Sequence, residues 1–185
     1  MWTLDPLLGK IFPDSRAEAD IRETEAELLD GLADGSFEMA VLLRTPPGAK
    51  WRGRAFLRER LGVLLPEGHR LARRRALRFA DLAGETFVMH GTIGFWAPLS
   101  RERIPRAKFF LQETLEALRS TVETVALPSF YTDLSLEAVP IPPGKAAIPL
   151  RDPEATATYH LVCRADRAAA LAPLFAALPS LPAAR

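Results

Sequence analysis

The chain has 185 residues, of which 48% are hydrophobic and 25% are charged, an ordinary composition for a soluble globular protein. This length predicts one compact domain or two small lobes, and it is sufficient to bury a core without covalent cross-links. The 24 basic and 23 acidic residues give a net charge of +1, so the overall charge gives no indication of nucleic-acid binding.

The single cysteine, Cys163, excludes an intramolecular disulfide and any zinc site with several cysteines. It lies in an apolar run, 159–163, which favours an inert core thiol over a nucleophile. No N-terminal segment combines a basic region with an apolar stretch, and no run reaches the roughly 20 apolar residues of a membrane span. We therefore expect a cytoplasmic protein, or one whose N-terminal portion was removed.

The first part of the chain predicts a helix between two strands. Residues 17–21 alternate weakly in polarity, as in a strand. A capping box then opens a helix, with the Thr24 hydroxyl and the Glu27 carboxylate each covering an exposed N–H. Gly35 suits the left-handed end of this helix, and 37–43 is typical of a strand buried on both faces. Such a β-α-β unit predicts a parallel strand pair with a right-handed crossover.

The middle of the chain predicts two strands separated by a basic surface. The first strand covers 61–65 and ends at Pro66, and a short helical patch at 79–83 precedes the second strand at 85–89. The basic run between them consists of Arg70, Arg73, Arg74, Arg75 and Arg78. Because no aromatic residues are interleaved, a solvated surface is favoured over a nucleic-acid site, with an acidic patch of a partner as the alternative.

The remaining elements also alternate in type. They are a turn and helix start at 90–96, strands at 108–111 and 125–127, a helix capped by Thr114, an extended proline-rich segment at 138–143, strands at 146–150 and 156–162, and a final helix that begins near 171. Pro173 is expected in the first turn of that last helix. Strands alternating with helices indicate an α/β fold.

Catalytic and metal-binding signatures are not found in this sequence. His69, His90 and His160 lie far apart, without the spacing of a zinc site. There is no nucleophile elbow, phosphate loop or dinucleotide fingerprint. The sequence therefore predicts no metal, no cofactor and no catalytic residues, and enzyme activity is unsupported rather than excluded.

Residues that follow predicted strands are the candidates for ligand binding. In α/β sheets the carboxyl ends of strands open into the crevice where ligands bind. The turn after 85–89 brings His90, Thr92 and Gly94 to the start of a helix, whose N–H groups suit a carboxylate. The further candidates placed just beyond strands are Thr45, Gln112, Thr114, Ser129 and Phe130. Ordinary caps and turns are the alternative interpretation of each of these residues.

Three segments carry a resemblance to a known family. Residues 58–89 include a strand ending in Pro-x-x-His-x-Leu, followed by ADLAGETF; residues 25–42 read EAELLDGLADGSFEMAVL; and residues 149–167 read PLRDPEATATYHLVCRADR. In this order they resemble the effector-binding domain of LysR-type transcriptional regulators. The family's glycine-rich segment before Pro128 is replaced here by residues without glycine, and its N-terminal winged helix-turn-helix is missing.

The resemblance implies a two-lobed, periplasmic-binding-protein-like (type II) fold with two crossing strands. One lobe would comprise residues 1–60 and 146–185 and the other residues 61–145, with a small effector in a cleft between them. That cleft would be lined near Thr3, at Thr92, Ile93 and Gly94, and at Ser129 and Phe130. The resemblance further implies a homodimer that contacts DNA through a separate domain and responds to a small carboxylate or aromatic acid.

Two alternatives remain open at this point. A solute-binding protein of the periplasmic type would share the two-lobed architecture. A small α/β enzyme would use His90 together with a nearby carboxylate. The leading hypothesis is the effector-sensing and dimerisation domain of a LysR-type regulator.

Overall fold

A computed structural model of the chain describes residues 24–91 and 94–181. The described residues form two compact units. Unit 1 is Glu59–Thr156, and unit 2 comprises residues 24–58 and 157–181. The boundaries fall inside the long strand β2 (Trp51–Pro66) and at the first residue of β7 (Thr156–Arg164).

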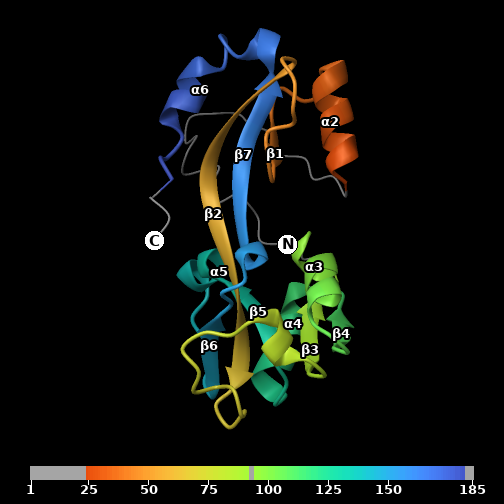
Figure 1. The fold of residues 1–185 in the computed structure, drawn as a ribbon, viewed down its shortest axis with the longest axis vertical. Helices are drawn as coiled ribbons and strands as arrows, with labels where there is room; N and C mark the ends of the chain where they lie inside the picture. Colours follow the sequence, from red (N-terminus) through yellow and green to blue (C-terminus); the bar gives the residue numbers. More distant parts are fainter. Residues whose placement is uncertain (1–23, 92–93, 182–185) are drawn as a thin grey trace. The chain divides into compact units, whose positions relative to one another are not determined.

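Strands and helices alternate along the chain, as predicted for an α/β protein (Figure 1). The other strands are β1 (Ala40–Leu42), β3 (Thr86–His90), β4 (Lys108–Gln112), β5 (Ser129–Thr132) and β6 (Lys145–Pro149). The α-helices are α2 (Glu25–Asp34), α3 (Trp96–Arg103), α4 (Leu115–Thr124), α5 (Asp133–Ala138) and α6 (Ala172–Ala177). Short 3₁₀ helices are η1 (Phe79–Leu82), η2 (Pro153–Ala155) and η3 (Ala165–Arg167). Within residues 24–91 and 94–181, none of the helices combines the length and hydropathy that a membrane crossing requires.

Unit 2 packs α2 against a small antiparallel pair of strands. The predicted capping box is confirmed, because the Thr24 hydroxyl accepts a hydrogen bond from the Glu27 N–H and the Glu27 carboxylate accepts one from the Thr24 N–H. Strand β1 pairs antiparallel with β7. The core consists of Leu32, Ala40, Leu42 and Val162, with Leu28, Leu29, Phe37 and Trp51 packed around it. The strand predicted at 17–21, and with it the parallel pair, lies outside the described residues.

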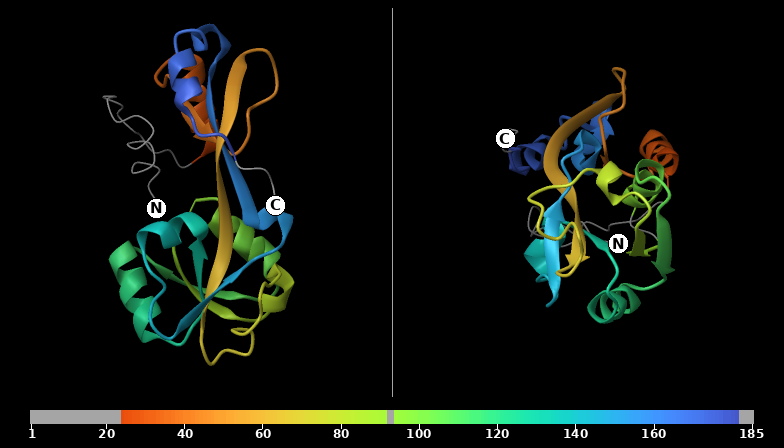
Figure 2. Two further views of the ribbon diagram at one scale, coloured as in Figure 1. Left: turned by 90° about the vertical axis from the view of Figure 1, so that its left-hand side faces the viewer. Right: turned by 60° about the horizontal axis from the view of Figure 1, so that its bottom comes forward.

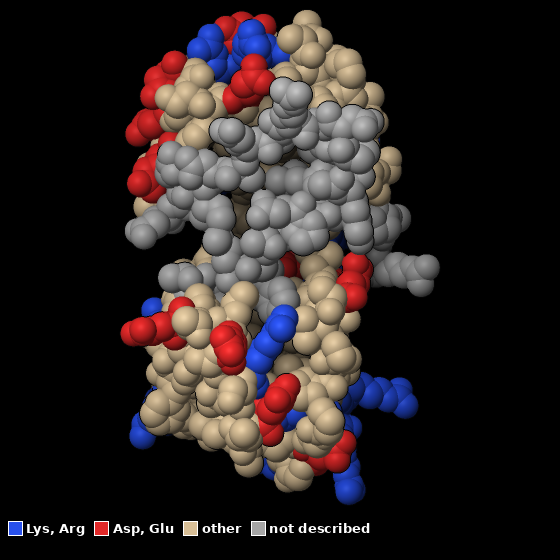
Figure 3. Space-filling view, turned by 180° about the vertical axis from the view of Figure 1, so that it is seen from behind, with Lys and Arg blue, Asp and Glu red and all other residues tan. Residues whose placement is uncertain are grey.

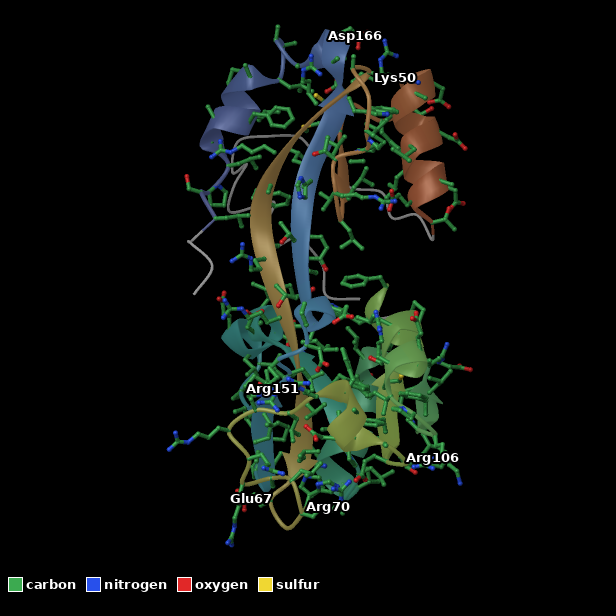
Figure 4. The ribbon with its side chains drawn as sticks, in the orientation of Figure 1. Lys50, Glu67, Arg70, Arg106, Arg151 and Asp166 are labelled. Atoms are coloured by element: carbon green, nitrogen blue, oxygen red, sulfur yellow. The ribbon has the colours of Figure 1, made fainter. Side chains whose placement is uncertain are left out.

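The strand predicted at 37–43 is shorter in the structure, covering only 40–42. The reason lies in Phe37, whose N–H donates to the Gly31 carbonyl at 2.9 Å and so continues the turn at the end of α2. The start of β2 and the end of β7 meet at the far end of this unit, where the Ala165 N–H donates to the Lys50 carbonyl at 2.7 Å. Figure 4 shows Lys50 and Asp166 close together there.

Unit 1 contains a mixed sheet in the order β6-β2-β5-β3-β4. Strand β2 pairs antiparallel with β5 and β6, whereas β3 pairs parallel with β4 and β5. Figure 2 shows α3, α4 and α5 beside these strands. Strand β6 was predicted to belong to the other lobe, beyond residue 145. Its five paired positions with β2 instead hold it in unit 1, and the unit boundary lies at residue 156.

Strand β2 is much longer than predicted. The prediction limited it to 61–65 because the charged residues Arg58, Glu59 and Arg60 interrupt the apolar pattern. The structure extends it over 16 residues, and Glu59 is buried within it, only 4% exposed. The Trp96 indole N–H donates to the Glu59 carboxylate at 3.0 Å, so a buried charge is accommodated by a specific partner.

The strand predicted at 125–127 is wrong. The carbonyls of Val125 and Leu127 accept hydrogen bonds from the Lys145 ammonium at 2.8 and 3.0 Å, so these two carbonyls are not paired with a neighbouring strand. Burial lowers the pKa of Lys145. The strand, β5, begins only after Pro128. Helix α5 was not predicted; Thr132 caps it through a box that uses a serine in place of the usual glutamate.

The basic run after β2 is a surface loop fixed to the body of unit 1. Arg70 forms an ion pair with Glu85 at 2.8 Å, and His69 lies 3.2 Å from the same carboxylate. Figure 4 shows Arg70 and Glu67 in this loop. On the face displayed in Figure 3, acidic and basic side chains are interspersed rather than gathered in one large patch. Arg70, Arg73, Arg74, Arg75 and Arg78 are all exposed, which favours the solvated-surface interpretation of these arginines.

Candidate functional site

The parallel strands of unit 1 end where the sequence predicts a ligand site. His90 is the last residue of β3 and lies opposite Gln112, the last residue of β4. The Gly91 N–H donates to the Gln112 carbonyl at 3.0 Å and continues the pairing by one step. Gly94 follows with a φ of +59°, a left-handed conformation that glycine adopts easily, and α3 begins at Trp96.

A small pocket lies beside these strand ends, entirely within unit 1, with a volume of about 30 Å³. Its apolar lining consists of Leu61, Val88, Met89, Leu118 and Phe130. Its polar lining consists of His90, Trp96, Tyr131 and Thr132. An apolar wall with a few convergent polar groups is typical of small-molecule sites. The volume suits one polar group of a ligand or a small substituent, such as a carboxylate.

Stacked aromatic rings fix one wall of the pocket. The ring of Phe130 stacks on Phe87, with ring centroids 4.7 Å apart and an interplanar angle of 14°. Phe87 in turn stacks on Phe109 of the next strand, at 5.7 Å and 20°. Because Phe87 is fully buried, this ladder gives Phe130 a rigid backing.

The polar side chains of the pocket differ in how their hydrogen-bonding capacity is used. Trp96 donates to Glu59 at 3.0 Å. The Thr132 hydroxyl accepts from the Ser135 N–H at 3.2 Å, as the cap of α5. His90 is 8% exposed and takes part in an interaction of its own. The Tyr131 hydroxyl makes no hydrogen bond within the described residues.

The structure brings two of the predicted residues, His90 and Phe130, into this pocket. Ser129 precedes Phe130 in β5; it is 2% exposed, and its hydroxyl has no hydrogen-bond partner within the described residues. Thr114 is 3.1 Å from the Ala117 N–H, which it caps at the start of α4, so its acceptor capacity is used structurally. The predicted residues Thr3, Thr92 and Ile93 lie outside the described residues.

Thr45 belongs to unit 2 and has a structural partner there. Its hydroxyl is 3.1 Å from Nδ1 of His160. Burial lowers the pKa of His160, which favours the neutral imidazole. Gly53 of β2 makes room for the pair, because an added Cβ there would overlap the Thr45 side chain. This half-buried contact gives both Thr45 and His160 a structural role in unit 2.

Other chemistry receives little support from the described residues. Cys163 is fully buried, and burial together with the charge of Asp166 raises the pKa of its thiol. Within residues 24–91 and 94–181, no three His, Cys, Asp or Glu side chains converge as a metal site would require. The pocket in unit 1 is therefore the best candidate functional site.

Comparisons with known proteins identify the family. The LysR substrate binding domain family matches residues 12–179. The chain belongs to this family. It is the effector-sensing domain of a LysR-type regulator, and its mixed α/β fold is of the periplasmic-binding-protein-like type II class, as the resemblance in the sequence implies. The family is one of transcription regulators.

Solved structures of LysR-type regulatory domains share the fold. The reduced OxyR regulatory domain from Pseudomonas aeruginosa is 19% identical, with a TM-score of 0.70 over 94% of this chain and 87% of that chain. The MetR regulatory domain from N. meningitidis is 15% identical, with a TM-score of 0.70 over 97% and 90%. The CcmR regulatory domain from Synechocystis PCC6803, in complex with 2-PG, is 14% identical, with a TM-score of 0.64 over 97% and 91%.

The chain covers 62% of full-length OxyR C199D from Pseudomonas aeruginosa. No curated protein sequence matches the chain.

Seven pocket residues were not predicted from sequence, and most of them are apolar. They are Leu61, Val88, Met89, Trp96, Leu118, Tyr131 and Thr132. The apolar members look like core positions in the sequence, because their spacing is that of strands and helices. Trp96 carried a usable signal, since it begins a helix directly after the glycine turn.

Proposed function

We propose that the effector of this LysR-type domain contacts the pocket of unit 1, and that it is a small carboxylate or aromatic acid. The pocket at the ends of β3 and β5 carries this proposal. It supplies an apolar lining and a polar lining that includes His90 and Thr132. An aromatic or aliphatic acid would place its apolar body on the first and its oxygens on the second. Contacts of the effector with Gln112, Ser129 and Gly94, which the sequence predicts, are part of the same proposal.

The regulatory step would be a population shift. An effector that binds one conformation of the domain more tightly than another biases the equilibrium between them by its differential affinity. We further propose that this bias reaches DNA through a separate DNA-binding domain of a cytoplasmic regulator. The greater length of full-length OxyR supports this view, because the present chain spans 62% of it.

Thermal unfolding tests the effector proposal. The chain is titrated with a library of small carboxylates and aromatic acids. A ligand at 100 times its Kd stabilises by about 2.7 kcal/mol, which raises the Tm of a chain of this size by about 5–10 °C. Leu118 lines the pocket on α4, and Leu118→Trp should abolish the shift by filling it. Leu115→Trp, at a half-buried position on the same helix outside the pocket, should keep it. Stabilisation that survives Leu118→Trp, or no stabilising compound at all, would contradict the proposal.

We also propose that the domain forms a homodimer through the edge strand β4. In the described part of the chain, β4 pairs with β3 alone, so its other edge is open. Phe110 and Leu111 on this strand are 59% and 49% exposed. An open edge with exposed apolar side chains favours pairing with another chain.

Sedimentation equilibrium tests the dimer. Phe110→Glu should give a monomer, whereas Ile141→Glu, which charges another exposed apolar site (43%), should leave the dimer intact. A monomeric wild-type chain, or a dimer that tolerates Phe110→Glu, would refute this interface.

A further inference from the structure

The chain passes between the two units at two places in its described part. Strand β2 leaves unit 2 after Arg58 and enters unit 1 at Glu59, and the chain returns to unit 2 after Thr156, the first residue of β7. Strands β2 and β7 are neighbours in the sheet (Figure 1). The contacts that hold these two crossings to unit 1 therefore decide how firmly each strand is attached to the unit that bears the pocket.

Helix α3 contacts both crossings, one at each of its ends. At its first residue, the Trp96 indole N–H donates to the Glu59 carboxylate at 3.0 Å, and both residues are buried. At its last residue, Arg103 forms an ion pair at 2.8 Å with Glu154, which lies two residues before Thr156. The side chains of this ion pair are 43% and 40% exposed, so solvent weakens it, whereas the hydrogen bond to Glu59 is shielded. The firmer attachment is therefore the one at β2.

Trp96 is also part of the pocket wall. Side chains of a strand alternate between its two faces, so Glu59 and Leu61 project to the same side of β2. Leu61 lines the pocket and lies opposite Thr132, another lining residue, in the antiparallel pair with β5. The indole that reaches Glu59 thus stands on the side of β2 that bears the pocket. A molecule in the pocket would contact a side chain that is hydrogen-bonded to the first residue of unit 1 on β2.

We propose that Trp96 couples occupancy of the pocket to the attachment of both crossings, and that Glu59 and Arg103 are the positioning residues of this coupling. The inference rests on the proposed function, because it assumes that the effector enters this pocket, and it adds the route by which binding acts on the strands that connect the units. An effector that packs against the indole favours the conformation in which the indole holds Glu59. By thermodynamic linkage, holding Glu59 in turn favours effector binding. Because Arg103 ends the same helix, this step also restrains the segment that enters β7.

Two main-chain amides report on the crossings by their rates of hydrogen exchange. The Arg60 N–H donates to the Asp133 carboxylate at 2.8 Å, and the Ala155 N–H donates to the main-chain carbonyl three residues earlier at 2.9 Å. Each exchanges when its segment opens. Saturating the domain with sodium benzoate should slow both by at least about fivefold, the lower end of typical coupling between two sites. The hydrogen-bonded Phe37 N–H of unit 2 should exchange at an unchanged rate, and equal slowing there would reject a local coupling.

Two substitutions of Glu59 separate its role as an acceptor from its charge, since Glu59 makes a further interaction besides that with Trp96. The benzoate Kd is measured from the amide shifts of residues 88–90 and 129–132. Glu59→Leu removes the acceptor from outside the pocket lining; it should raise this Kd by at least about fivefold, and benzoate should no longer slow the exchange of Arg60. Glu59→Gln keeps an oxygen that can accept from the indole, and it should restore most of both effects.

A substitution of Arg103 tests the second attachment. Arg103→Gln breaks the ion pair with Glu154, and it should reduce the slowing at Ala155 by about twofold, the effect of an exposed ion pair, while the slowing at Arg60 remains. Arg101→Gln removes another exposed positive charge from the last turn of α3 and is the matched control. It should keep the slowing at both amides.

The possible failures are distinguishable. Benzoate that shifts the pocket signals without slowing Arg60 or Ala155 would reject the coupling and leave the proposed function standing. Slowing that survives Glu59→Leu, or a loss that Glu59→Gln does not restore, would reject the route through Trp96. Equal slowing at Ala155 in the wild type and in Arg103→Gln would reject the second attachment. Benzoate that shifts no signal of the pocket would reject the inference together with the assignment of this pocket to aromatic carboxylates.

Discussion

Replacing Trp96 with Phe should destabilise unit 1 because it removes a hydrogen bond to the buried Glu59 carboxylate. Trp96 and Glu59 are each 4% exposed, and the indole N–H donates to the carboxylate at 3.0 Å. A hydrogen bond to a charged group contributes about 1.5–3 kcal/mol, and Trp96→Phe removes this one, while Glu59 keeps a further interaction. The smaller ring adds a packing loss of about 1 kcal/mol. We expect the free energy of unfolding to fall by about 2.5–4 kcal/mol.

A double-mutant cycle isolates the hydrogen bond from the packing loss. Glu59→Leu removes the charge, and the double variant with Trp96→Phe replaces both partners by apolar groups. Because the two groups depend on each other, the loss in the double variant should be smaller than the sum of the single losses by about 2 kcal/mol. Urea unfolding followed by far-UV circular dichroism measures each free energy.

Trp51→Phe provides the control for this cycle. Trp51 is a half-buried tryptophan of unit 2, with the Lys50 ammonium 4.9 Å from its ring centroid, and it has no hydrogen bond to Glu59. Its loss should add to that of Glu59→Leu without coupling. Additivity within about 0.5 kcal/mol in the Trp96 cycle as well would refute the reasoning, because the pair would then contribute nothing specific.

Two further predictions concern groups of unit 2. Burial lowers the pKa of His160 below its unfolded value of 6.5, so the unfolded chain binds more protons between the two pKa values. The contribution of neutral His160 to folding stability is fully present above the unfolded pKa and is lost as the pH falls toward the folded pKa. Urea midpoints between pH 7.5 and 5 should therefore fall more steeply in the wild type than in His160→Gln. Equal slopes would contradict this prediction. Cys163 is fully buried with a raised thiol pKa, so its alkylation by iodoacetamide should be at least about 100-fold slower in the native chain than in urea, because reaction requires local opening. Comparable rates would show that the thiol is accessible.

The sequence was sufficient to predict the start of a helix where the capping residues lie within a few positions of one another. Thr24 and Thr114 were each predicted as caps and each accepts a hydrogen bond from the N–H three residues later. The helix capped by Thr132 was missed because its box closes with Ser135, whose shorter side chain does not match the usual pattern. The length of β2 was missed for a different reason. Its buried Glu59 depends on Trp96, 37 residues away in the sequence, and no local pattern contains that partner.

The sequence predicted residues of the candidate site near the ends of strands, but it did not predict the apolar residues that line the pocket. His90 was found because it stands where a strand of an α/β sheet finishes, whereas Phe130, which was predicted to follow a strand at 125–127, lies within β5. Leu118 and Val88 were missed because an apolar residue at helical or strand spacing has the same appearance in a core and in a pocket. Only the packing of the sheet against α4 decides which of them faces open space, and that packing depends on contacts distant in sequence.

Two glycines of β2 make room for side chains of neighbouring segments, which the sequence of the strand alone does not indicate. An isolated glycine within a strand pattern ordinarily weakens the strand or marks a bulge. Gly53 in unit 2 and Gly62 in unit 1 instead lie beneath Thr45 and Tyr131, with no room for a Cβ in either place. Both overlying side chains carry hydroxyls, and that of Thr45 lies 3.1 Å from a ring nitrogen of His160. Each glycine weakens β2, but it makes room for the side chain that lies above it. A glycine within a strand can therefore indicate that a side chain of the neighbouring segment packs closely against the strand backbone.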